Sequence, residues 1–149
     1  MKNATKTVYL SLFLAFAPSA HSVQKISITG NDQMQFSVRE FVVEAGKAVE
    51  IEFKNIGKLP KIAMGHNLVI LKKGISSISF GGKAASAGAN ATNALPDSVK
   101  NDVLAYTKLL GPGEKDVIKF TAPSEPGAYQ FLCSFPGHYA IMRGIMTVK

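Results

Sequence analysis

Several short stretches of the chain alternate between polar and apolar residues, and a period of two is typical of β-strands with one buried face. The clearest stretch covers residues 48–54, where Val49, Ile51 and Phe53 share one side. The same pattern predicts four further strands, over residues 25–29, 116–122, 128–134 and 143–149. Glycine, proline and asparagine separate these stretches. Many short strands with such turns between them predict an all-β fold, either a β-sandwich or a β-barrel.

The alternation breaks down between residues 72 and 101. Residues 81–91 consist of glycine, alanine, serine and asparagine apart from one lysine, which indicates a flexible surface segment. Pro96 and Asp97 are typical of a helix start, so we expect a short helix from there to about Tyr106. The region has no histidine, cysteine or methionine. We therefore interpret it as a short helical flap outside the sandwich, with no chemistry of its own.

Residues 1–20 have the composition of a secretory signal peptide. Two lysines precede an apolar run over residues 8–17, and small residues follow it. A helix that crosses the hydrocarbon core of a bilayer needs about 20 apolar residues, so this run is too short for a retained membrane anchor. The small residues fit cleavage after either Ala20 or Ser22. We therefore expect residues 21–149 to form a single exported domain, located in a bacterial periplasm.

The net charge narrows the choice of partners. The chain has a formal charge of +7, and removal of residues 1–20 would take away two lysines and no acidic residue, leaving +5. A mild positive charge favours a partner with an acidic surface. The basic residues are scattered along the chain, which argues against nucleic acid as a partner.

The chain contains a single cysteine, Cys133, so no disulfide can form within it. Small secreted domains commonly use disulfides. A lone thiol in an oxidising compartment is a liability unless it is buried or bound to a metal. Tyr129, Phe131 and Cys133 have the same parity in a predicted strand, so the thiol faces the core if Phe131 does.

One short loop combines three potential metal ligands, Cys133, His138 and Met142, in the pattern C-x4-H-x3-M. His66 lies far upstream, and the third histidine, His21, lies in the cleavage region. A lone histidine or methionine is more often a packing or surface residue than a ligand. Two histidines, one cysteine and a weak methionine, however, are the ligand set of a trigonal copper centre. Zinc could also bind the cysteine and histidines, although structural zinc sites rarely use methionine.

These residues and their surroundings resemble the azurins, blue (type 1) copper proteins of the cupredoxin family. The matching stretches are residues 30–36, 59–67, 107–110, 113–116 and 133–142, spread over nearly the whole predicted mature chain. The interval from cysteine to histidine is specific, because plastocyanin-like and amicyanin-like relatives use a shorter one. The auracyanins are the nearest confusable relatives. The resemblance implies a cupredoxin-like Greek-key β-sandwich or barrel that holds one copper per chain.

The resemblance also implies the geometry of the copper site. Cys133, His66 and His138 would form its equatorial plane. Met142 and the main-chain carbonyl oxygen of Gly65 would lie above and below that plane as axial ligands. A protein with such a site is not expected to be an enzyme, because catalysis on a substrate needs an open coordination position at the metal.

Around the ligands, the resemblance implies two further groups of residues. The main-chain amides of Asn67 and Phe135 would donate hydrogen bonds to the cysteine sulfur, and the Asn67 side chain would brace the ligand loop. Electrons would leave through the ring edge of His138, within an exposed apolar patch. The residues implied for this patch are Met34, Leu59, Ala63, Met64, Phe135, Pro136, Ala140 and Ile141.

The expected function is therefore one-electron transfer between exported redox proteins. Its partners would be a cytochrome, a dehydrogenase or a reductase that docks transiently near His138, and the carrier would be a monomer with no membrane anchor after processing. The alternative is a periplasmic copper chaperone or storage protein. That class usually offers exposed and exchangeable methionine or cysteine clusters.

The chain departs from the azurin pattern in three places. It lacks the usual disulfide, and Leu68 stands where many azurins have a tryptophan. Asn55 stands where azurins commonly have a histidine that is not a ligand but whose protonation affects the redox potential. Without that histidine, we expect the potential to depend weakly on pH between about 5 and 8.

Overall fold

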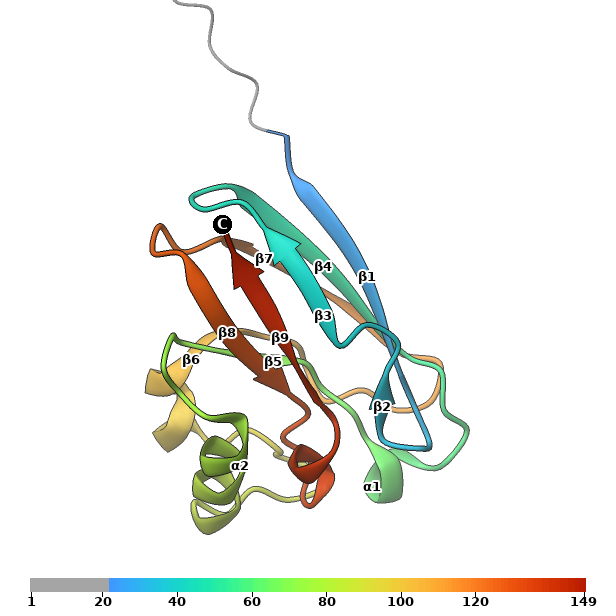
Figure 1. Cartoon of the computed structure of the whole chain (residues 1–149). Helices are drawn as coiled ribbons and strands as arrows, with labels where there is room; N and C mark the ends of the chain where they lie inside the picture. The colour runs from blue at the N-terminus through green and yellow to red at the C-terminus, as the bar shows by residue number, and fades with distance from the viewer. Residues whose placement is uncertain (1–21) are drawn as a thin grey trace, which may run out of the picture.

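The computed structural model describes residues 22–149 (Figure 1). The predicted signal peptide lies outside these residues. Within the described range, no helix is long and apolar enough to cross a membrane.

Two β-sheets make up most of the molecule. One sheet has the strand order β2-β1-β4-β7, formed by β1 (Gln24–Asn31), β2 (Gln35–Phe36), β4 (Ala48–Asn55) and β7 (Lys115–Thr121). The other has the order β3-β9-β8-β5-β6, formed by β3 (Glu40–Val43), β5 (Val69–Leu71), β6 (Val103–Tyr106), β8 (Gly127–Leu132) and β9 (Arg143–Val148). Both sheets are mixed, because β1 pairs with β4 and β3 pairs with β9 in parallel while the other pairs are antiparallel. The short helical segments are α1 (Lys61–Met64), α2 (Ser77–Ser86), η1 (Asp97–Asp102) and η2 (His138–Ala140).

The main core lies between the two sheets. In β4, alternation places Ile51 and Phe53 inside, as the sequence predicts. The ring of Phe36 lies 5.7 Å from that of Phe53 and 5.4 Å from that of Phe131, so it joins strands of both sheets. Phe131 and Cys133 pack into the main core, whereas Leu132 between them packs on the other face of the sheet, which confirms the predicted parity. The predicted all-β sandwich is therefore confirmed.

Strand β5 was not predicted, because its sequence does not alternate. Residues 68–71 form a continuous apolar run in which every side chain is buried. Ile70 packs into the main core, whereas Val69 and Leu71 point to the opposite side of the sheet and pack into a second core. A strand that is covered on both faces has no polar face, so its sequence shows no period of two.

The flap lies outside the sandwich, as predicted, but its internal structure differs from the prediction. The segment expected to be flexible contains most of helix α2, which Ser76 caps by accepting a hydrogen bond from the Ser79 amide. The prediction of a helix that reaches Tyr106 is wrong. Helix η1 ends at Asp102, because the following residues pair with β5 as strand β6. The flap packs on the outer face of the five-stranded sheet through a second core made of Val69, Leu71, Phe80, Ala84, Leu95, Val99, Val103 and Leu132.

Candidate metal centre

Three of the predicted ligands come from the loop that joins two antiparallel neighbours, β8 and β9. Cys133 directly follows β8, His138 begins η2, and Met142 directly precedes β9. The amide of Cys133 donates to the carbonyl of Met142 at 2.9 Å, which closes the loop at its base. His66 comes from the segment between α1 and β5, where its main chain exchanges two hydrogen bonds with Leu110, at 3.0 and 2.8 Å.

The three strong donor atoms lie close enough to share one ion. Sγ of Cys133 is 3.6 Å from Nδ1 of His138 and 3.9 Å from Nδ1 of His66, and all three donor atoms lie within 4.8 Å of one another. Metal bonds of about 2.3 Å to sulfur and about 2.0 Å to nitrogen, at about 120°, place sulfur and nitrogen about 3.7 Å apart. The two sulfur-to-nitrogen distances therefore already suit a trigonal metal site.

Burial sets the protonation state of the three donors. It raises the pKa of the Cys133 thiol to about 12, although the main-chain amides of Asn67 and Phe135 act in the opposite direction by hydrogen bonding to the sulfur. Burial lowers the pKa of His138 to about 4, with a smaller contribution from the charge of His66. It also lowers the pKa of His66. At neutral pH both imidazoles are thus neutral and able to bind a metal, and the thiol proton leaves when a cation takes its place.

Comparison with known proteins points to the same kind of site. Residues 22–149 match a family described as copper binding proteins of the plastocyanin/azurin family. The chain belongs to this family. The predicted copper cofactor fits both this membership and the cluster of His66, Cys133 and His138.

Individual relatives are similar over most of their length. An azurin from Alcaligenes faecalis is 40% identical over 134 residues, which cover 83% of this chain and 96% of the relative. An azurin from Pseudomonas aeruginosa is 37% identical over 142 residues, which cover 93% of each chain. Among solved structures, a dithionite-reduced auracyanin from Roseiflexus castenholzii is 36% identical with a TM-score of 0.72, covering 85% of this chain and 97% of that one. An azurin from Methylomonas sp. strain J is 31% identical with a TM-score of 0.72, covering 85% and 98%. The predicted cupredoxin fold is thus confirmed.

Asn67 ties the segment of His66 to the ligand loop. Its Oδ1 accepts a hydrogen bond from the amide of Ser134 at 2.8 Å, and its Nδ2 donates to the Ser134 hydroxyl at 2.9 Å. Both residues are buried. Because Ser134 directly follows Cys133, these bonds fix two ligand-bearing segments relative to each other. Ser134 was not singled out from the sequence, where a serine gives no sign of its partner.

The two residues predicted to supply the axial ligands lie next to His66. Met142 is fully buried, and a Cβ atom at Gly30 would lie 2.8 Å from its Cε and 3.4 Å from Cδ2 of His66. Gly30 therefore leaves the room in which the thioether end of Met142 lies near His66. Gly65 directly precedes His66, and a Cβ atom there would lie 2.7 Å from the carbonyl oxygen of Lys61. Axial ligation by Met142 and by the carbonyl of Gly65 remains a prediction.

Most residues of the expected apolar patch are exposed. Leu59 is 45% exposed and Ile141 is 53% exposed. The other exposed members of the expected patch are Ala63, Pro136 and Ala140, while Met34 and Met64 are half-buried. Ile62 on α1 is also exposed and was not expected in the patch.

Phe135 was expected on the exposed patch, but this prediction is wrong, because Phe135 is only 6% exposed. Its ring packs against that of His138, with 4.5 Å between centroids. His138 is itself only 4% exposed, so little of its side chain reaches the solvent. The sequence could not show this, because an aromatic residue next to a ligand suits either the core or the surface.

Proposed function

We propose that this protein is a periplasmic one-electron carrier. When bound, copper supplies a Cu(II)/Cu(I) couple, and the residues of the chain hold it. The observation that carries the proposal is the buried cluster of one thiol and two imidazole nitrogens, with sulfur-to-nitrogen distances of 3.6 and 3.9 Å. A thiolate with two imidazoles and a weak thioether is the ligand set of blue copper electron-transfer sites.

The frame around the donors supports fast transfer. His138 donates its amide hydrogen to the carbonyl of Phe135 at 3.0 Å, and the carbonyl of His138 accepts from the amide of Met142 at 2.8 Å. Together with the bonds of Asn67, these contacts fix the donors through the backbone. Donors that are already in position move little when the charge at the site changes, so little energy is spent on rearrangement.

The exposed apolar surface over His138 is the proposed place where redox partners dock. A patch of this kind loses its water on contact and suits brief association. We expect the partners to be cytochromes, dehydrogenases or reductases, and the carrier to be a monomer. An enzymatic role is not proposed, because Cys133 and His66 are fully buried and offer no route for a substrate.

The alternative of a copper chaperone or storage protein is less well supported. Exchange of copper between proteins needs donors that a second protein can reach. The thiol of Cys133, the only one in the sequence, is fully buried and hydrogen-bonded by two amides. No observation on the described residues favours exchange.

Export rests on the sequence of residues 1–20. We propose that this signal peptide is removed and that residues 21–149 form the single working domain. Mass spectrometry of the protein recovered from a periplasmic fraction should give an N-terminus at His21 or Val23. Recovery of the full chain from the cytoplasm would contradict export.

Voltammetry of the copper-loaded domain tests the function. We expect a reversible one-electron wave, and a Cu(I) chelator such as bathocuproine should remove copper slowly from the reduced protein. Rapid loss of Cu(I) to the chelator, with no reversible wave, would support the chaperone or storage role instead.

A further inference from the structure

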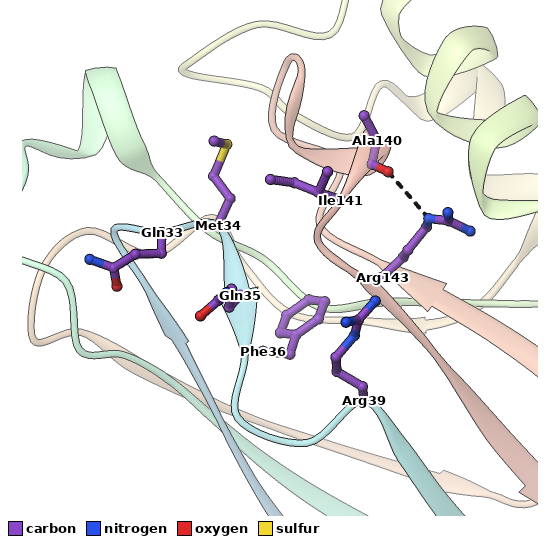
Figure 2. A pocket seen from close by; sticks show the side chains of 8 residues that line it. All are labelled: Gln33, Met34, Gln35, Phe36, Arg39, Ala140, Ile141 and Arg143. Carbon is purple, nitrogen blue, oxygen red and sulfur yellow. Dashed lines mark hydrogen bonds between the residues drawn. The ribbon is translucent and has the colours of Figure 1, made fainter.

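A pocket of about 590 Å³ opens beside the ligand loop, between β2, the start of β3 and the start of β9 (Figure 2). Its lining includes Met34, Ala140 and Ile141, which belong to the expected apolar patch, and the polar side chains of Gln33 and Gln35 beside Met34. The lining also includes two arginines, Arg39 and Arg143. The pocket therefore joins the proposed electron-transfer surface to a pair of positive charges.

These two arginines are the only ones in the sequence, in which every other strongly basic residue is a lysine. Six lysines form ion pairs on the surface, but neither arginine has an acidic partner among the described residues. The residues that line the pocket include no acid. Glu40 lines a neighbouring pocket that shares both arginines, yet it makes no ion pair with either.

The backbone fixes the two arginines next to each other. The carbonyl of Arg39 accepts a hydrogen bond from the amide of Ile145 at 2.8 Å, where β3 runs beside β9. Nε of Arg143 donates to the carbonyl of Ala140 at 3.3 Å, which directs this side chain along the ligand loop (Figure 2). The terminal nitrogens of both guanidinium groups have no partner among the described residues, so their N–H donors are free to bind an anion.

We propose that this pocket binds a surface carboxylate of the redox partner and so anchors the partner over His138. The proposal rests on the proposed electron-transfer function and adds the chemistry of its partner, namely an acidic side chain beside the partner's redox centre. Arginine suits this task better than lysine, because its planar fork binds a carboxylate through two parallel hydrogen bonds. Arg143 directly follows Met142, so the anchor would place the partner next to the site.

The surroundings favour a protein over a small free anion as the occupant. Both arginines are exposed, and an exposed ion pair in water contributes little to the binding free energy. A protein that also covers Ile141 and Ala140 would remove water from the pair and so strengthen it. The positive net charge of the chain would also attract an acidic partner.

Stopped-flow kinetics with the copper-loaded domain tests the proposal. The probe is an acidic c-type cytochrome with carboxylates around its exposed haem edge, and a basic cytochrome of similar potential is the reference. The test variant is Arg39→Gln/Arg143→Gln. The matched control is Lys25→Gln/Lys149→Gln, which removes the same charge from two exposed lysines at the end of the sandwich away from the site.

With the acidic cytochrome at low salt, the arginine variant should have a second-order rate constant for electron transfer about tenfold or more below that of the wild type. This rate constant should also lose most of its salt dependence. The lysine control should change the rate by less than about twofold. The variant Arg39→Lys/Arg143→Lys should recover only part of the rate, because it keeps the charge but loses the fork. An unchanged visible spectrum in each variant shows that the site is intact.

Several results would overturn the proposal. If Arg39→Gln/Arg143→Gln and Lys25→Gln/Lys149→Gln lowered the rate constant equally, only the net charge would matter. If Arg39→Lys/Arg143→Lys recovered the full rate constant, the planar fork of arginine would not matter. Inorganic phosphate that binds to the wild type but not to the arginine variant, at concentrations that block the cytochrome, would assign the pocket to a small anion. Dimers that dissociate on arginine substitution would assign it to a second copy of the chain.

Failure of the proposed function and failure of the anchor give different results. If the wild type reduced neither cytochrome, the proposed function itself would fail. If it reduced both at rates that do not depend on the arginines, only the anchor proposal would fail.

Discussion

At the scale of single residues, the side chain of Asn67 links the segment of His66 to the loop of Cys133 through hydrogen bonds to Ser134. Replacement of Asn67 by alanine leaves the buried amide of Ser134 without a partner, so we expect a loss of about 1–3 kcal/mol in unfolding free energy. The copper should also leave faster, because His66 and Cys133 are no longer held together. Urea unfolding and chelator-driven loss of copper measure the two effects. The variant Ser134→Ala keeps the amide bond and should lose less; an equal loss would contradict this account.

The protonation of the donors predicts how the stability of the metal-free protein depends on pH. His138 has its pKa lowered from 6.5 to about 4, so its contribution is complete above pH 6.5 and is lost as the pH falls toward 4. Cys133 has its pKa raised from 9.0 to about 12, so its contribution is complete below pH 9 and is lost as the pH rises toward 12. We therefore expect the unfolding free energy to be highest between about pH 6.5 and 9, as measured by urea unfolding at each pH.

The variant Cys133→Ser is the control for the alkaline side, because serine does not ionise in this range. Its unfolding free energy should decline less than that of the wild type above pH 9. Identical declines in the two proteins would show that the thiol does not cause the loss.

Asn55 bears on the pH dependence of the redox potential. It is fully buried, its Nδ2 donates to the carbonyl of Leu110 at 3.1 Å, and its Oδ1 accepts from the amide of Gly57 at 2.8 Å. An amide with these bonds does not titrate, and the two described histidines are both expected ligands. Voltammetry should therefore show a nearly constant potential between about pH 5 and 8. A strong shift without loss of copper would contradict this prediction.

At the scale of elements, helix α2 supports the ligand loop from outside. Figure 1 shows α2 beside η2, and the backbone of Gly81 packs directly on the ring of Tyr139, the residue after His138. A methyl group at Gly81 would overlap that ring. We expect Gly81→Ala to cost about 1–3 kcal/mol through overpacking and to alter the visible spectrum of the copper-loaded protein.

Gly82 provides the matched control, because a Cβ atom there would meet nothing within 4 Å. Gly82→Ala should stabilise the protein by about 0.5–1 kcal/mol, since alanine favours a helix more than glycine does. Thermal unfolding and the spectrum measure both variants. A Gly81→Ala variant that behaves like Gly82→Ala would show that α2 does not constrain the loop.

The same elements show why the sequence predicted only part of the fold. Strands with one buried face, such as β4, alternate and were predicted nearly to their ends. Strand β5 is covered on both faces, and β6 is held mainly by its pairing with β5, so neither shows a local pattern. Helix α2 contains two adjacent glycines, which lower the local preference for a helix, and contacts such as that of Phe80 with the second core override it.

At the scale of the whole molecule, the loops at one end of the sandwich bring the functional parts together. The ligand loop and α1 lie at the end opposite the C-terminus (Figure 1), and the arginine pocket opens beside that loop (Figure 2). Three candidate ligands, Cys133, His138 and Met142, could be singled out because they share one short loop, and His66 because few histidines exist in the chain. The pairing of Arg39 with Arg143 could not, because the parallel contact of β3 with β9 joins residues that are far apart in sequence.

The visible spectrum of the purified domain after addition of Cu(II), repeated after addition of ascorbate, tests the central claim most directly. We expect an intense band in the orange-red region, because the thiolate of Cys133 would bond to the metal in a trigonal site. The band should bleach on reduction and return on oxidation. Uptake of copper without this band would show that Cys133 is not an equatorial ligand, and it would contradict the assignment of a blue copper electron carrier.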